Sequence, residues 1–220
     1  MMKLKLEWTY KTPKNQVITL MSDEVSAEEA LLLADDFERT GRTKEIVFYD
    51  ERHTKWTKKE IIKLMKVVET EPQDVIAYFD GGFDIQSGKA GLGVAIYYSQ
   101  SKKPYRVRVN EVFEEMESNN EAEYAAFWLL LNTLEEIGVQ HATVTFKGDS
   151  HVVLKQLSGE WPCFEENLNR WLDRIEERIE KLGIHPIYDP IGRKQNAEAD
   201  RLATQALEGT IVSSKIEIKG

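Results

Sequence analysis

The stretch VIAYFDGG at residues 75–82 decides the fold of most of this chain. Its apolar run predicts a buried strand that ends at Asp80 and is followed by two glycines. An acidic residue at the end of a hydrophobic strand, next to glycines, leaves open space for a ligand. A second stretch, ATVTFKGDS at residues 142–150, repeats the arrangement with a strand that ends at Asp149. Ligands of α/β sheets gather at the carboxyl ends of strands, so both acids are site candidates.

The order of elements around these stretches predicts an α/β fold. Three strands come first, at residues 75–80, 92–98 and 105–112, with a glycine-rich turn over residues 81–91. Helix and strand then alternate, with helices at 120–137, 150–157, 165–182 and 196–207 and strands at 142–146 and 184–188. We expect a mixed five-stranded sheet, three antiparallel strands and then parallel additions, flanked by helices. The first and fourth strands can then be central neighbours.

Residues 1–71 predict a separate, small α+β domain with the order strand, strand, helix, strand, helix. Ser26 with Glu29 and Thr57 with Glu60 have the form of capping boxes that open the two helices. A polar, proline-containing segment follows, so we place the second domain at residues 74–209 and a tail at 210–220. Aromatic residues among lysines make nucleic-acid binding one possible role of the first domain. A solvated helix face explains the lysines equally well, and dimerisation is the alternative role.

Composition narrows the class of protein. The chain has 220 residues, of which 41% are hydrophobic and 30% charged, enough to fill a core. The only cysteine, Cys163, excludes an intrachain disulfide and a cysteine-rich zinc site. No apolar run approaches the roughly 20 residues that span a bilayer, and the N-terminus has no signal core. We therefore expect a soluble cytoplasmic protein with no membrane partner.

The formal net charge of −9 argues mildly against a nucleic-acid partner, because phosphate contacts usually require a basic face. This argument is weaker if part of the negative charge belongs to a cluster of acids that binds cations, and two further acids extend the candidate cluster. Glu123 lies in the first turn of the long helix and Asp200 in the last helix, which gives four acids in all. Like charges held close together cannot all ionise cheaply without cations, and oxygen ligands suit Mg²⁺ or Mn²⁺. Two such ions, roughly 3.5–4 Å apart, can clamp an in-line phosphodiester displacement.

Each acid also has an ordinary structural interpretation. Asp80 could be a turn residue and Asp149 a helix N-cap. Glu123 could be a surface acid stabilised by the helix dipole, and Asp200 a helical surface residue. The functional interpretation depends on all four acids occurring together, in this order and in these elements.

Residues 75–207, about three-fifths of the chain, resemble ribonuclease H type 1. The four motifs that carry the resemblance occur in the family's order and are DGG at 80–82, NNEAEY at 119–124, GDS at 148–150 and NAEADRLA at 196–203. The resemblance implies a ribonuclease H-like sheet and a metal-dependent endonuclease that hydrolyses the RNA strand of RNA–DNA hybrids by a two-metal mechanism. It implies that Asp80, Glu123, Asp149 and Asp200 are catalytic acids and ligands of two Mg²⁺ or Mn²⁺ ions.

The resemblance also implies where the hybrid is bound. The implied substrate-binding residues are Gly81, Gly82, Ser118, Asn119, Asn120 and His151, with His151 standing where many members have glutamine. A-like duplexes have a wide minor groove that displays 2′-hydroxyl groups, which suits these contacts. Many members place a mobile histidine before the last helix. This chain has none there and resembles the branch that uses arginine, so Arg193 is the candidate for assisting product or metal release.

Two other functions remain as alternatives. The first is a hybrid- or duplex-binding protein with a weak or vestigial nuclease site. The second is another nuclease of the same broad fold, such as a 3′–5′ exonuclease or an integrase-like strand transferase. Exonucleases of that group usually carry a second acid two residues after the first aspartate, where this chain has Gly82. The sequence does not define the oligomeric state.

Overall fold

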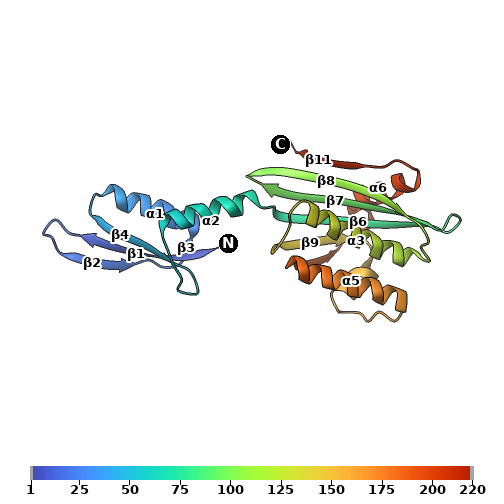
Figure 1. Ribbon diagram of the computed structural model, residues 1–220, viewed down its shortest axis with the longest axis horizontal. Helices are drawn as coiled ribbons and strands as arrows, with labels where there is room; N and C mark the ends of the chain where they lie inside the picture. The colour runs from blue at the N-terminus through green and yellow to red at the C-terminus, as the bar shows by residue number, and fades with distance from the viewer. Residues whose placement is uncertain (1, 219–220) are drawn as a thin grey trace. The chain divides into compact units, whose positions relative to one another are not determined.

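The computed structural model describes residues 2–218 and divides the chain into two compact units, residues 1–70 and 71–220 (Figure 1). Each unit has its own sheet and its own hydrophobic core. Within residues 2–218, no helix has both the length and the apolar character needed to cross a bilayer.

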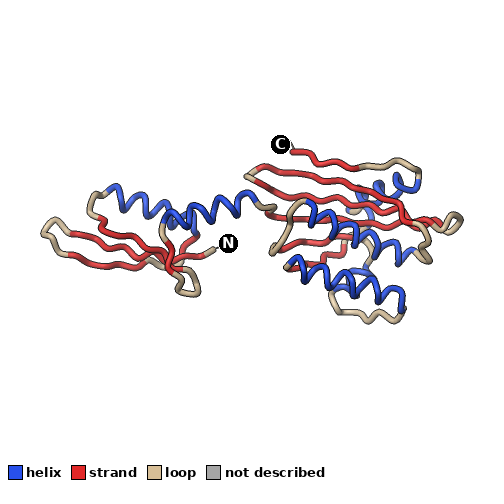
Figure 2. Tube along the Cα trace, in the orientation of Figure 1, coloured by secondary structure: helices blue, strands red, loops and turns tan. Residues whose placement is uncertain are grey.

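The N-terminal unit is a sheet with two helices on one face (Figure 2). Its elements are β1 (Lys3–Lys11), β2 (Val17–Met21), β3 (Val25–Ser26), α1 (Ala27–Arg39), β4 (Thr43–Tyr49), β5 (Lys55–Trp56) and α2 (Lys58–Thr70). The strand order is β2-β1-β4-β5, all antiparallel, and β3 also pairs with β1. Leu6 and Phe48 point to the helical face and pack with Ala30 of α1 and Ile61 of α2. The predicted order of elements is therefore present, with two short strands added.

Both predicted capping boxes form. The Ser26 hydroxyl accepts from the Glu29 N–H at 3.2 Å, and the Glu29 carboxylate accepts from the Ser26 N–H at 3.0 Å. Thr57 and Glu60 make the same reciprocal pair, at 3.3 and 2.7 Å. Each pair satisfies amides that a helix start leaves without a partner, which fixes where α1 and α2 begin.

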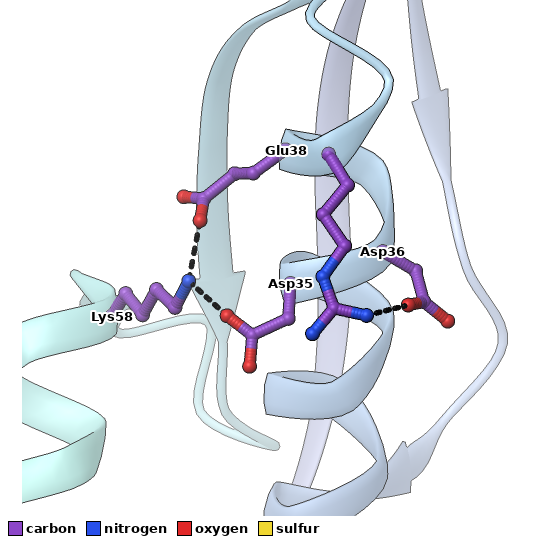
Figure 3. A network of polar contacts seen from close by, with 5 residues as sticks. Asp35, Asp36, Glu38 and Lys58 are labelled. Carbon is purple, nitrogen blue, oxygen red and sulfur yellow. Dashed lines mark hydrogen bonds and ion pairs between the residues drawn. The ribbon is translucent and has the colours of Figure 1, made fainter.

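An ion-pair network joins the two helices of this unit (Figure 3). Lys58, at the start of α2, donates to Asp35 at 2.6 Å and also to Glu38, both on α1. Arg39 pairs with Asp36 at 3.5 Å on the same helix. Lys58 thus adds a polar connection beside the apolar contacts that hold α1 and α2 on the sheet.

The C-terminal unit is a six-stranded mixed sheet with helices on both faces. Its elements are β6 (Gln73–Asp84), β7 (Lys89–Gln100), β8 (Lys103–Phe113), α3 (Asn119–Glu136), β9 (Thr143–Gly148), α4 (His151–Leu157), α5 (Glu166–Leu182), β10 (His185–Pro190), a 3-10 turn (Arg193–Gln195), α6 (Ala197–Leu207) and β11 (Ser213–Glu217). The strand order is β10-β9-β6-β7-β8-β11. As expected, β6, β7 and β8 are antiparallel neighbours and β9 and β10 are parallel additions. Strand β11 adds a further antiparallel pairing, with β8.

Two successive glycines show that α3 and α6 lie on opposite faces of this sheet. A Cβ on Gly81 would meet Ala122 of α3, whereas a Cβ on Gly82 would meet Leu207 of α6. Successive residues of a strand point to opposite faces, so the two helices must cover different sides. The core beneath α3 contains its buried Phe127, together with Phe79 of β6 and further aromatic and aliphatic residues.

The segment predicted as a C-terminal tail instead contributes a sixth strand. Strand β11 pairs with β8 and covers that edge of the sheet (Figure 1). Lys103 and Glu217 form an ion pair at 2.9 Å, and the Lys215 ammonium lies 5.5 Å from the ring centroid of Tyr98. The expectation of five strands was wrong because the free edge of β8 offers backbone partners to a segment with a weak strand pattern of its own.

The glycine-rich turn expected over residues 81–91 was also wrong. Strands β6 and β7 run on through most of these glycines, and the turn is confined to residues 85–88. Asp80 therefore lies inside β6, opposite Gly93 of β7, rather than at the end of a strand. The glycines serve close helix packing, since a Cβ on Gly91 would lie 2.1 Å from the Ala203 carbonyl oxygen of α6.

Candidate metal centre and active site

The register between β6 and β9 brings two acids to the same level. The parallel pairing runs from Val75 opposite Val144 to Tyr78 opposite Lys147, and then β9 ends. Continuing the same register two residues further sets Asp80 level with Asp149. Since β9 has ended there, the edge of β6 beside Asp80 is open to side chains. The backbone thus places both carboxylates together.

Helix α3 supplies the third acid. Ser118 caps this helix by accepting from the Glu121 N–H at 3.1 Å, and Glu123 follows, turned toward the sheet and only 7% exposed. The helix can approach because residue 81 is glycine: a Cβ there would lie 2.3 Å from the carbonyl of Ala122. Carboxylate oxygens of Asp80, Glu123 and Asp149 all lie within 4.8 Å of one another.

The electrostatics of this cluster favour a bound cation. Burial, followed by the charges of Asp149 and Asp200, raises the pKa of Asp80 to about 7. Burial and the charges of Asp80 and Asp149 also raise the pKa of Glu123 well above its usual value, against the opposing effect of the Gly81 N–H. Like charges in a low-dielectric site resist ionisation unless a cation compensates them.

Asn196 is a site residue that sequence reasoning missed. Its side-chain N–H donates to Asp149 Oδ1 at 2.8 Å, to the Phe79 carbonyl oxygen at 2.9 Å and more distantly to Asp80 Oδ1 at 3.4 Å. The side chain is 1% exposed at the start of α6. The sequence pattern predicted Asn196 only as the first residue of a helix. Its position in the last acidic motif was the one indication of a role in the site. It holds the two strand acids in place.

Asp200 lies beside the cluster without joining it. Its Oδ1 accepts from the Arg193 guanidinium at 3.0 Å, and its charge contributes to the raised pKa of Asp80. Arg193 lies in the 3-10 turn before α6 and is 81% exposed. Its positive charge lowers the pKa of Asp80, whereas the charge of Asp200 raises it. The structure thus brings three of the four acids together and leaves the fourth paired to the arginine.

The residues present fit a hard divalent cation. Glu123 Oε2 is buried and has no hydrogen-bond partner, an expensive arrangement unless a further ligand occupies that direction. Asn196 donates neutral hydrogen bonds and brings no charge, and the Arg193 guanidinium is engaged by Asp200. Carboxylate oxygens are the ligands that Mg²⁺ and Mn²⁺ favour. Asp80, Glu123 and Asp149 can hold such an ion.

The candidate substrate-binding residues border this cluster in sequence and are mostly accessible. Asn119 and His151 are exposed, and Asn120 is partly exposed. The Ser118 hydroxyl is engaged in capping α3, which leaves it less free than expected. Gly81 is buried beneath α3, and only Gly82 of the two glycines retains some exposure.

This mixed sheet, with helices on both faces and an acidic cluster beside its central strands, defines the ribonuclease H-like class of proteins. Residues 78–206 match the family described as reverse transcriptase-like. The chain belongs to that family. A Bacillus subtilis (strain 168) relative, uncharacterized protein YpeP, is 43% identical over 196 residues, which cover 89% of this chain and 86% of the relative.

Ribonuclease H proteins share the fold of the C-terminal unit. Ribonuclease HI of Halobacterium salinarum is 33% identical over 91 residues, 41% of this chain and 44% of that protein. The crystal structure of RNase H1 from this archaeon matches with a TM-score of 0.53 and 27% identity, over 61% of this chain and 98% of that chain. LC11-RNase H1 in complex with an RNA/DNA hybrid matches with a TM-score of 0.52 and 25% identity, over 62% and 98% of the two chains.

Proposed function

We propose that this protein is an endonuclease that hydrolyses the RNA strand of RNA–DNA hybrids. The observation that carries the proposal is the convergence of Asp80, Glu123 and Asp149 within 4.8 Å in a ribonuclease H-like fold. The likeness to ribonucleases H, one of them solved with an RNA/DNA hybrid, supports hybrid as the substrate. The proposed cofactor is Mg²⁺ or Mn²⁺, with two ions per site.

The acids would hold the ions that the reaction needs. When bound, such ions supply an activated water and stabilise charge on the scissile phosphate. Asp80 and Asp149, fixed by Asn196, form a rigid pair of ligands. Glu123 offers its unpartnered oxygen from α3, and Asp200 is the proposed fourth ligand once it is released from Arg193.

Arg193 is proposed to assist release of product or metal. Its ion pair with Asp200 is exposed to water, which screens the attraction, so little free energy opposes its exchange. A guanidinium recognises phosphate with paired donors. Arg193 can therefore leave Asp200 for a phosphate oxygen and return.

The proposed hybrid contacts lie where α3 begins. Asn119 and Asn120 present amide groups less than two turns before Glu123 on the same helix. Amide donors and acceptors suit the minor groove of an A-like duplex, where 2′-hydroxyl groups and base edges are displayed. A contact to the RNA strand there would set the scissile phosphate near the carboxylates, with Gly82 and His151 as further contacts.

The test is cleavage of labelled hybrid, double-stranded RNA and duplex DNA by the purified protein with Mg²⁺ or Mn²⁺. We expect cutting of the RNA strand of the hybrid, and a fall in rate of about three orders of magnitude in Asp80→Asn, because several kcal/mol of charge stabilisation depend on the ligands. Asp173→Asn makes the same chemical change on the exposed surface of α5 and should leave the rate unchanged. Hybrid that is bound but uncut with either metal would instead favour the hybrid-binding function.

A further inference from the structure

Strand β2 is an edge strand without the usual protection. Its sequence, VITLM, contains no charged residue and no proline, and every residue is exposed. The four apolar side chains, Val17, Ile18, Leu20 and Met21, are 44–59% exposed. In residues 2–218, β2 pairs with β1 alone, so its other edge is open. Natural proteins normally block such an edge with charge, proline or a covering element.

The backbone shows which groups of β2 point outward. The Thr12 N–H donates to the Gln16 carbonyl oxygen, and the Ser22 N–H donates to the Leu6 carbonyl oxygen. The backbone N–H and C=O groups of the even-numbered residues of β2 are therefore directed toward β1. In an antiparallel ladder, these groups alternate between the two sides of a strand. The N–H and C=O groups of Val17, Thr19 and Met21 are therefore directed away from the sheet.

We propose that a second copy of this chain pairs with β2 through this edge. An antiparallel pairing centred on Thr19 sets Val17 opposite Met21 of the second copy and Thr19 opposite its own equivalent. All three residues direct their backbone groups outward, so each opposed pair exchanges two hydrogen bonds. The same surface serves both copies, as a two-fold interface requires. The sheets of two N-terminal units then become one.

Charge at the ends of β2 favours this partner and this direction. Lys14 precedes the strand, and Asp23 and Glu24 follow it, with Glu24 also pairing with Lys5 of β1 at 3.5 Å. An antiparallel pairing brings Lys14 of one copy to the acidic end of the other, twice, whereas a parallel pairing would set like charges together. The strand is thus complementary to its own copy in hydrogen bonding, direction and charge, which an arbitrary peptide strand would not be.

The apolar side chains are matched as well. Ile18 and Leu20 lie opposite Tyr10 and Trp8 of β1, and Trp8 stacks on Phe37 of α1, so both lie on the helical face. In the proposed pairing, Ile18 of one copy meets Leu20 of the other on that face. Each of these side chains is close to half exposed, and the contact would bury apolar area that the single unit leaves in water.

The test is the mass of the full chain in solution, by sedimentation equilibrium. We expect twice the monomer mass for the wild-type protein and for Thr19→Ala, which keeps the backbone N–H. Thr19→Pro removes that outward N–H, which β1 does not use, and should give a folded monomer by circular dichroism. A wild-type monomer up to the solubility limit, or a Thr19→Pro protein that remains dimeric, would overturn the proposal.

Hydrogen exchange and a charge exchange provide independent readouts. In the dimer, the amides of Val17, Thr19 and Met21 should exchange as slowly as those of Ile18 and Leu20; slow exchange of the latter two alone would contradict the pairing. Lys14→Glu should weaken the dimer by about tenfold, because two like-charge contacts form. Adding Asp23→Lys to Lys14→Glu should restore it, and this change leaves the Lys5–Glu24 ion pair in place. None of these residues belongs to the acidic cluster, so failure of this proposal leaves the nuclease proposal untouched.

Discussion

At the scale of single residues, the carboxyl groups of Asp80 and Glu123 oppose folding when no cation is bound. Both are more than nine-tenths buried, and they face Asp149, with neutral donors from Asn196 and Gly81 beside them. The charge of Arg193 lowers the pKa of Asp80, but less than burial and the neighbouring acids raise it. A buried carboxylate in such surroundings is stabilised by a proton or by a metal ion. The free energy of unfolding of the metal-free protein should therefore respond to pH at this cluster.

The expected pH response has a definite sign. The pKa of Asp80 is about 7 in the folded protein and ordinary in the unfolded chain, so the folded state holds an extra proton between roughly pH 4 and 7. Stability contributed by that proton is complete below this window and lost as pH rises through it. In EDTA, wild-type protein should lose a few kcal/mol relative to Asp80→Asn between pH 5 and 8. Urea titrations of both proteins measure this difference, and parallel pH curves would contradict it.

At the scale of elements, glycines decide how closely the helices approach the sheet. A Cβ on Gly93 would lie 2.1 Å from the Ala199 carbonyl oxygen, whereas a Cβ on Gly82 would meet Leu207 at an ordinary 3.7 Å. Both glycines sit in strands against α6. The acids depend on this packing because Asn196, which holds two of them, stands at the start of that helix.

Alanine at these two positions should have different effects. Gly93→Ala should reduce the free energy of unfolding by about 3 kcal/mol or more, since the helix backbone must move away from β7. Gly82→Ala should change it by less than about 1 kcal/mol, because nothing must move. Chemical denaturation of the two variants under identical conditions provides the comparison. Equal losses would show that α6 is not held against the sheet by its contact at Gly93.

Local patterns predicted the helices, the capping boxes and the mixed sheet, because caps and periodicity act over a few residues. They failed where distant segments decide the outcome. Gly81 and Gly91 resembled turn residues, since the helices that need them lie far away in sequence. Strand β11 depends on the free edge of β8, and the role of Asn196 depends on three separate elements. The four acids were recognisable as motifs, but that Asp200 pairs with Arg193 could not be predicted.

At the scale of the whole molecule, the chain combines two units with separate cores and separate chemistry. The acidic cluster draws all its members from residues 71–220. The proposed self-pairing edge belongs to residues 1–70. Binding that involves one unit should therefore leave the local stability of the other unchanged, unless the two are coupled.

Addition of Mg²⁺ offers a direct test of this separation. A ligand at one hundred times its Kd stabilises the folded state by about 2.7 kcal/mol. Amides of β6, β9 and α3 should become more protected from hydrogen exchange in Mg²⁺ than in EDTA, while those of β1 and α1 should not change. Asp149→Asn should abolish the gain. Protection that rises equally in both units would instead indicate that they unfold together.

The parallel register of β6 and β9 has a consequence for how this site can vary among relatives. Asp80 and Asp149 meet because Asp149, directly after β9, stands at the height of Asp80 in the register of the adjacent strands β6 and β9. Residues can be inserted in the loops before either strand without disturbing that match. A slip of one position between the strands would turn one carboxylate to the other side of the sheet. Divergent sequences should therefore differ in the lengths of these loops. In each strand, however, the number of residues between the first residue paired with the other strand and the acid should stay the same.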